Sequence, residues 1–129
     1  MPACLKIDVI SIFPEILDAY LGESMMKRAA QAGLVSFRTI DLRDFTHDAH
    51  RSVDDRPYGG GPGMVMRPDP LFEAVEAVRT PESRVILMSP QGRPFTQTRA
   101  KDLSTEKHLI LVCGHYEGVD ERVREALAD

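Results

Sequence analysis

The chain has 129 residues, of which 43% are hydrophobic and 28% are charged, and its formal net charge is −4. This balance is typical of one globular domain and excludes a disordered chain, while the acidic charge excludes nucleic-acid binding through bulk electrostatics alone. No apolar run approaches the roughly 20 residues that span a bilayer, and the N-terminus lacks the pattern of a signal peptide, so we expect a cytoplasmic protein with no membrane partner.

The first third of the chain predicts a strand, a helical region and a second strand. Residues 5–12 are apolar and β-branched, and the proline at 14 stops the strand and can open a helix. Residues 14–32 have apolar side chains at helical spacing with an interruption near Gly22, which predicts one broken helix or two short ones. Gly33 is placed to end this region as a C-cap, and residues 35–42 alternate as a strand does.

A polar segment at residues 43–63 follows, and it is too long to be a mere connector. Between residues 53 and 64 stand four glycines, two prolines, two aspartates, one arginine and one tyrosine. Glycines let the backbone approach a ligand, and prolines stiffen the segment. A plain glycine-rich turn is the alternative, but the charges and the aromatic ring favour a loop that binds a ligand.

This loop matches neither of two familiar phosphate-binding patterns. A Walker loop requires Gly-Lys-Ser/Thr, whereas Met64 and Val65 follow Gly63. The dinucleotide pattern would require glycine in place of Met64. Arginines flank the loop and could position a nucleic acid on an acidic domain, with solvated surface arginines as the alternative. These arginines are Arg51, Arg56 and Arg67.

The second half of the chain predicts strands and helices in alternation. Two nearly continuous apolar runs are typical of strands covered on both faces, and a crossover helix between them makes the strands parallel. The predicted elements are a short extended piece at 64–66, a helix at 68–79, a strand at 84–89, a helix at 96–104, a strand at 108–113 and a helix at 119–128.

Both of these apolar strands end in glycine-containing loops, at residues 89–93 and 114–122. Ligands bind outside the carboxyl ends of strands in open α/β sheets, so the two loops predict one crevice. Gly114 lets the backbone close on a ligand, although a simple tight turn remains the alternative. Tyr116 offers an apolar ring with a hydroxyl, and Glu117 adds a carboxylate.

Other reactive side chains give weaker signals. Cys4 and Cys113 border apolar strands, which favours reduced, buried thiols over a disulfide. His47 and His50 could form a metal pair, but no third ligand is evident, so no metal centre is predicted. Ser89 lacks the Gly-x-Ser-x-Gly context of a nucleophile elbow, so a serine hydrolase is not supported.

Four segments resemble, in the same order, the signatures of the bacterial tRNA (guanine-N1)-methyltransferases of the TrmD type. They are residues 11–15, 54–64, 89–93 and 113–122, and the resemblance runs from about residue 6 to residue 123. It implies an α/β fold of the SPOUT class, with a mostly parallel sheet, helices on both faces and a trefoil knot that is incomplete here. It also implies that residues 1–129 are a truncated N-terminal cofactor-binding methyltransferase domain, without the C-terminal tRNA-binding domain.

The activity that this resemblance implies is transfer of a methyl group from S-adenosylmethionine to N1 of the guanine 3′ of the anticodon in tRNA. The implied partners are tRNA and a second copy of the chain, with part of residues 13–33 at the dimer interface. A magnesium requirement is left open. The family assigns catalysis to Glu117, and the implied cofactor-binding residues are Leu87, Met88, Ser89, Pro90, Gly114, Tyr116 and Glu117. The implied substrate-binding residues are Asp54, Asp55, Arg56, Tyr58, Gly59, Gly60, Gly61 and Gly63.

Members of this family continue for roughly as long again, through a second cofactor loop and a proposed aspartate general base. We therefore expect this polypeptide alone to have little activity. The alternative is a non-catalytic nucleotide- or phosphate-binding α/β module. It is less favoured because the carboxylates of Asp54, Asp55 and Glu117 would repel phosphate.

Overall fold

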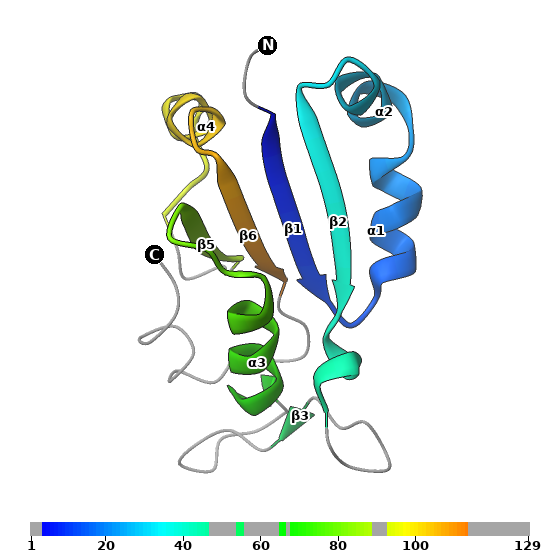
Figure 1. Ribbon diagram of the computed structural model, residues 1–129, viewed down its shortest axis with the longest axis vertical. Coiled ribbons are helices and arrows are strands. Elements are labelled where there is room, and N and C mark those ends of the chain that lie inside the picture. Colours follow the sequence, from blue (N-terminus) through cyan, green and yellow to red (C-terminus); the bar gives the residue numbers. More distant parts are fainter. Residues whose placement is uncertain (1–3, 47–53, 56–64, 67, 89–92, 114–129) are drawn as a thin grey trace.

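The computed structural model describes residues 4–46, 54–55, 65–66, 68–88 and 93–113. Figure 1 shows a twisted sheet with helices packed beside it, in agreement with the predicted α/β class. The strands alternate with helices along the chain, so each crossover returns the chain to the same end of the sheet.

Four strands form the main sheet: β1 (Leu5–Ser11), β2 (Val35–Asp41), β5 (Ser83–Met88) and β6 (His108–Cys113). Their order across the sheet is β2-β1-β6-β5, and every neighbouring pair is parallel. The predicted parallel sheet is therefore confirmed. β6 coincides with the predicted range, β1 and β2 each end one residue earlier than predicted, and β5 begins and ends one residue earlier than predicted.

The helical region after β1 is two short helices, α1 (Pro14–Leu21) and α2 (Ser24–Gln31). Pro14 opens α1, as the fixed φ of proline favours. Gly33 has a φ of +75° and ends α2, as predicted. The amide of Gly33 donates to Ala30 and that of Leu34 donates to Ala29, which is the paired hydrogen bonding of a Schellman motif.

Two further helices are α3 (Pro68–Val78) and α4 (Gln97–Ser104), both close to the predicted ranges. Thr96 caps α4, because its hydroxyl accepts a hydrogen bond from the amide of Arg99 at 3.2 Å. The helix predicted at 119–128 lies outside the described residues.

The segment predicted as a polar loop contains local structure that its composition did not indicate. A 3₁₀ turn, η1 (Leu42–Phe45), begins where β2 ends, because the carboxylate of Asp41 accepts from the amide of Arg43 at 2.9 Å. The short strand β3 (Asp54–Asp55) pairs antiparallel with β4 (Val65–Met66), and β4 confirms the predicted extended piece.

The main core lies between α3 and one face of the sheet. Leu71, Ala74 and Val75 of α3 are fully buried there against alternate residues of the strands. The connections from β1 to β2 and from β5 to β6 run across the sheet in one direction, and the connection from β2 to β5 through α3 runs in the other. Because such crossovers are right-handed, α3 lies on the face opposite α1, α2 and α4. The buried cluster comprises Ile10, Ile12, Leu42, Leu71, Ala74, Val75, Val85, Ile110 and Val112.

The two apolar runs differ in how far they are covered. In β6 four of the six residues are buried, as a strand covered on both faces requires. In β5 Val85 is buried, but Met88 is 52% exposed. The difference arises because β5 is an outermost strand of the described four-stranded sheet. Hydrophobic content alone does not reveal which strand is outermost.

Candidate functional site

The carboxyl ends of the four parallel strands meet at one edge of the sheet, the edge near α3 and β3 in Figure 1. Met88 and Cys113, the last residues of β5 and β6, pair with each other. The two glycine-containing loops therefore start from adjacent positions. This placement is what the predicted crevice requires, since ligands of α/β sheets bind outside the carboxyl ends of strands.

Two of the predicted cofactor-binding residues, Leu87 and Met88, lie within the part of the chain that the structure describes. The side chain of Leu87 packs against the buried core, so what it can offer a ligand is its backbone. Met88 is the next residue and is 52% exposed, so its thioether side chain gives an apolar surface at this edge. The other predicted cofactor residues, Ser89, Pro90, Gly114, Tyr116 and Glu117, lie outside the described residues.

The predicted substrate loop has a defined base. Asp54 pairs with Met66 and Asp55 pairs with Val65, so the two ends of the segment at 56–64 lie side by side. Figure 1 shows β3 beyond the carboxyl ends of the main strands, on the side of the predicted crevice. The remaining predicted substrate residues, Arg56, Tyr58, Gly59, Gly60, Gly61 and Gly63, and the flanking Arg51 and Arg67 lie outside the described residues.

Arg43 joins the ends of β1 and β2 at the same edge, and no sequence motif marks it. Its guanidinium donates a hydrogen bond through Nη1 to the carbonyl of Ile12 and lies 5.8 Å from the centroid of the Phe13 ring. The amide of Phe13 in turn donates to Ser11 Oγ at 2.9 Å. Arg43 therefore holds the turn after β1 against η1, which leads toward the glycine-rich loop. Only the register of β1 with β2 brings these residues together.

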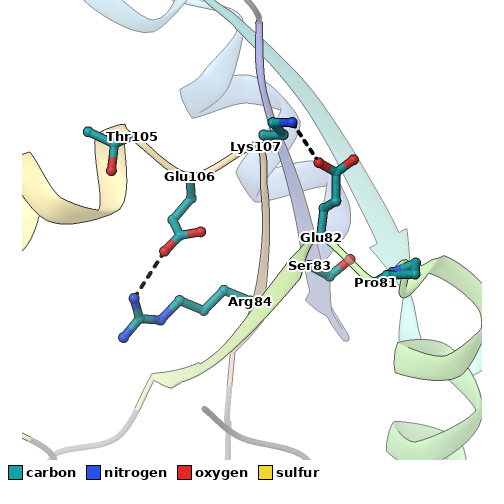
Figure 2. A pocket seen from close by; sticks show the side chains of 7 residues that line it. All are labelled: Pro81, Glu82, Ser83, Arg84, Thr105, Glu106 and Lys107. Carbon is teal, nitrogen blue, oxygen red and sulfur yellow. Dashed lines mark hydrogen bonds and ion pairs between the residues drawn. The ribbon is translucent and has the colours of Figure 1, made fainter.

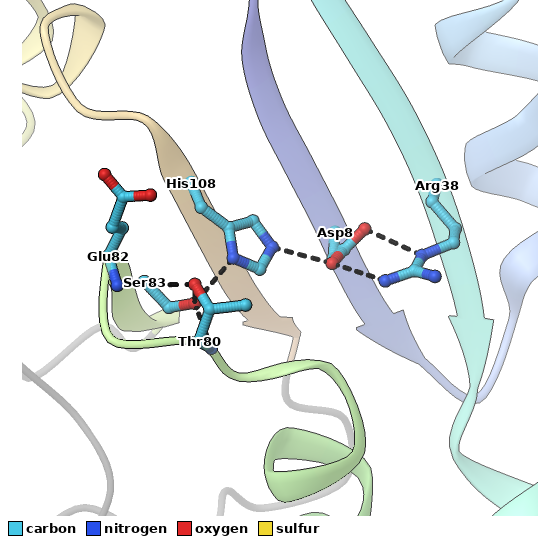
Figure 3. Close-up of polar contacts among 6 residues, drawn as sticks. All are labelled: Asp8, Arg38, Thr80, Glu82, Ser83 and His108. Carbon is cyan, nitrogen blue, oxygen red and sulfur yellow. Dashed lines mark hydrogen bonds and ion pairs between the residues drawn. The ribbon is translucent and has the colours of Figure 1, made fainter.

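A second polar cluster crosses the sheet away from this edge (Figure 3). Asp8 accepts two hydrogen bonds from Arg38, at 2.9 and 2.8 Å, and lies 2.7 Å from Nε2 of His108. The other ring nitrogen of His108, Nδ1, lies 2.5 Å from the hydroxyl of Ser83, which accepts from the amide of Thr80 at 2.8 Å. The members come from β2, β1, β6, β5 and the turn before β5.

Asp8 is the centre of this row and is only 5% exposed. Burial by itself raises the pKa of its carboxyl, but hydrogen bonds and charge from Arg38 and His108 outweigh burial, and the pKa lies below its ordinary value. The same contact with Asp8 raises the pKa of Arg38. A charged residue inside an apolar strand was visible in the sequence, but its partners lie 30 and 100 residues away.

An open cleft of about 620 Å³ lies at the amino ends of β5 and β6, opposite the predicted crevice (Figure 2). Two ion pairs border it: Arg84 with Glu106 at 3.1 Å, and Lys107 with Glu82 at 2.8 Å. Because both cations are matched by carboxylates, the cleft does not offer the excess positive charge of an anion site. Its lining residues are Pro81, Glu82, Ser83, Arg84, Thr105, Glu106 and Lys107.

The two cysteines agree in part with the sequence prediction. Cys4 and Cys113 are free thiols that are partly buried, and burial raises the pKa of Cys113. Within the described ranges, no three His, Cys, Asp or Glu side chains gather as a metal site, and no helix is long and apolar enough to cross a bilayer. His47 and His50 lie outside those ranges.

Comparison with known proteins assigns the chain to a family. The family model described as tRNA (Guanine-1)-methyltransferase TrmD matches residues 5–129. A protein of Macrococcus caseolyticus named tRNA (guanine-N(1)-)-methyltransferase is 52% identical over 124 residues, covering 95% of this chain and 51% of the relative. A protein of the same name from Dehalococcoides mccartyi is 54% identical over 127 residues, covering 96% and 51%.

A solved structure agrees with these relatives. The crystal structure of tRNA (m1G37) methyltransferase from Aquifex aeolicus matches with a TM-score of 0.81 and 40% sequence identity, over 95% of this chain and 56% of that one. The chain thus spans about half the length of the curated relatives it matches. The match along residues 5–129 confirms the resemblance, and the chain belongs to the tRNA (guanine-1)-methyltransferase TrmD family.

Proposed function

We propose that this chain is the cofactor-binding part of an enzyme that transfers a methyl group from S-adenosylmethionine to N1 of the guanine 3′ of the anticodon in tRNA. The observation that carries the proposal is the family match over residues 5–129. The paired ends of β5 and β6 support it, because ligands of α/β sheets bind outside the carboxyl ends of neighbouring strands.

The described residues fit S-adenosylmethionine at this edge. Met88 offers an exposed apolar side chain there, and Leu87, whose side chain serves the core, leaves its backbone for hydrogen bonding. Apolar walls with a few placed polar groups are what small-molecule sites require. When bound, the cofactor supplies the methyl group. The residues proposed to hold it are Leu87, Met88, Ser89, Pro90, Gly114, Tyr116 and Glu117.

The chain's own residues are proposed to bind and orient the guanine. N1 of guanine loses a proton when it is methylated, and its lone pair must be aligned with the methyl group, so positioning beside a carboxylate is what the protein must provide. Glu117 is assigned this catalytic role. The substrate site comprises Asp54, Asp55, Arg56, Tyr58, Gly59, Gly60, Gly61 and Gly63, and magnesium is a second cofactor to be tested by chelation.

A homodimer in the cytoplasm is the proposed working form. The outer side chains of α1 and α2 include Ile16, Tyr20 and Met25, which are 69%, 65% and 75% exposed. Exposed large apolar side chains on neighbouring short helices are typical of a protein–protein interface. The dimer proposal therefore rests on these helices.

Calorimetric titration with S-adenosylmethionine tests the proposal, with the intact Macrococcus caseolyticus relative as the positive control. We expect this chain to bind the cofactor more weakly than the relative and to show little tRNA methylation alone, because it spans about half the relative's length. Methylation at the rate of the relative would contradict the second expectation. Binding of inorganic phosphate or a nucleotide, without binding of S-adenosylmethionine, would favour the non-catalytic module.

A further inference from the structure

The row of hydrogen-bonded side chains formed by Asp8, His108 and Ser83 lies outside the proposed methyltransferase site, and the neutral form of His108 would set the direction of its hydrogen bonds. Asp8 accepts a bidentate pair of hydrogen bonds from Arg38, so it is a carboxylate and can only accept. Nε2 of His108, 2.7 Å from Asp8, must therefore donate. In the neutral ring Nδ1 is then an acceptor for the hydroxyl of Ser83, whose oxygen also lies 3.1 Å from the hydroxyl oxygen of Thr80.

Ser83, His108 and Asp8 together have the parts of an activated nucleophile. A hydroxyl donates to an imidazole nitrogen, and a buried carboxylate holds the opposite ring nitrogen, which fixes the tautomer and would stabilise an imidazolium. The two ring nitrogens are exchanged relative to the usual serine–histidine–aspartate order, but either nitrogen can take a proton. The amide of Thr80 donates to Ser83 Oγ at 2.8 Å, which favours negative charge on that oxygen.

Ser83 stands next to solvent. It is half-buried, and its neighbours Pro81 and Glu82 are exposed. Ser83 also lines the open cleft, but in Figure 2 its hydroxyl points toward Pro81 and away from Arg84 and Glu106. A small reagent reaches Oγ from the turn at Thr80, because the hydrogen bonds between Thr80 and Ser83 Oγ are exposed. Ser89 lacks the sequence context of a nucleophile elbow, whereas the fold brings serine, histidine and aspartate together at Ser83.

We propose that Ser83 is a nucleophile activated by His108, which small acyl or phosphonyl electrophiles with a good leaving group modify. With a fluorophosphonate, the bond from Ser83 Oγ to phosphorus forms and the phosphorus–fluorine bond breaks. The hydroxyl proton moves to Nδ1 of His108, and fluoride leaves. The proposal is independent of the methyltransferase function, and its test uses no methyl donor.

The test is labelling with a small fluorophosphonate, followed by peptide mass spectrometry. The internal reference is Ser104, an exposed serine whose hydroxyl donates only to the carbonyl of Lys101 among the contacts described for it. We expect Ser83 to react at least roughly 100-fold faster than Ser104, the scale of general-base assistance. Ser83→Ala should abolish the fast label, and Ser104→Ala should leave it unchanged.

His108→Gln is the decisive variant, because glutamine can still donate to Asp8 but cannot take the proton. With folding checked by circular dichroism, the rate at Ser83 should fall to that of Ser104. The proposal is overturned if Ser83 is labelled at the same rate in His108→Gln as in the unsubstituted protein. It is also overturned if Ser83 and Ser104 are labelled at equal rates in the unsubstituted protein. If the variant does not fold, ¹⁵N NMR of the unmodified protein decides: a neutral His108 with its proton on Nδ1 would also overturn it.

Discussion

A single carboxylate, Asp8, accepts hydrogen bonds from both neighbouring strands. It is 5% exposed and contacts Arg38 on β2 and His108 on β6. Replacing one member of a buried ionic cluster leaves the charge of its partners uncompensated. This is among the few mechanisms that give large destabilisation. Asp8 should therefore contribute more to stability than the ion pairs on the surface.

Asp8→Asn is expected to lower the free energy of unfolding by about 2–3 kcal/mol, below the full buried-pair value because the Arg38 side chain is 61% exposed. Urea denaturation measures the change. The matched control is Glu82→Gln, which breaks the exposed pair with Lys107 and should leave the midpoint almost unchanged. Equal shifts in the two variants would contradict the central role of Asp8.

The same carboxylate makes stability depend on pH. Its pKa in the fold lies below the ordinary 3.8, so on acidification the unfolded chain takes up the proton first. This contribution is complete above about pH 5, begins to fall near the unfolded pKa, and is lost as the pH falls through the native pKa. Urea titrations from pH 7 to pH 3 should show a falling free energy of unfolding, with a shallower fall in Asp8→Asn. Parallel curves for the two proteins would show that other groups carry the effect.

At the residue scale the sequence indicated positions but not partnerships. Asp8 falls within a predicted strand, and Met88 and Gly114 could be placed at strand ends by pattern. The contacts of Asp8 with His108 and of Arg43 with Ile12 depend on strand register, which hydrophobic alternation does not fix between distant segments.

At the scale of elements, Gly33 is the clearest local determinant. It ends α2 with a φ of +75°, and a β-carbon added there would meet no atom within 4 Å. The penalty for another residue is therefore conformational. Gly33→Ala should lower the free energy of unfolding by about 1 kcal/mol, since the left-handed region costs an L-residue this much. Urea denaturation tests this.

Gly33→Asn is the matched comparison, because asparagine tolerates the left-handed conformation better than alanine. It should retain more of the stability than Gly33→Ala. The reverse ranking, or no loss in either variant, would mean that the Schellman turn does not limit stability.

Most elements could be predicted because each has a local cause. Pro14 opens α1, Thr96 caps α4, and apolar runs mark the strands. Two features were not predicted. η1 begins because Asp41 caps it instead of continuing the strand, and the exposure of β5 follows from its place at an edge of the sheet. The cap of η1 is local, two residues along the chain, but hydrophobic periodicity does not report it. The exposure of β5 depends on how the strands are arranged.

For the whole molecule, self-association should depend on the outer faces of α1 and α2. Met25→Glu places a charge on a side chain that is 75% exposed, so it should weaken dimerisation without unfolding the chain. Sedimentation velocity over a concentration series measures this. Phe95→Glu changes an exposed aromatic residue outside these helices, 73% exposed, and should leave association unchanged. Equal effects of both changes would contradict the proposed interface.

Family and fold could be predicted from the sequence, since the motifs at 54–64, 89–93 and 113–122 occur in order along one chain. The family match and the TM-score of 0.81 confirm them. The geometry of the side chains at the predicted crevice could not be predicted from the sequence, because the order of motifs gives neither distances nor orientations. The roles assigned to Glu117 and to the substrate loop stay predictions.

The most direct test of the central claim is amide chemical-shift mapping of this chain by NMR during titration with S-adenosylmethionine. The account predicts saturable shifts at Met88 and Cys113, the paired ends of β5 and β6, and none at Glu82 or Lys107 beside the opposite cleft. Shifts at Glu82 and Lys107 with Met88 and Cys113 unchanged, or no shift at millimolar cofactor, would contradict cofactor binding at the carboxyl edge of the sheet.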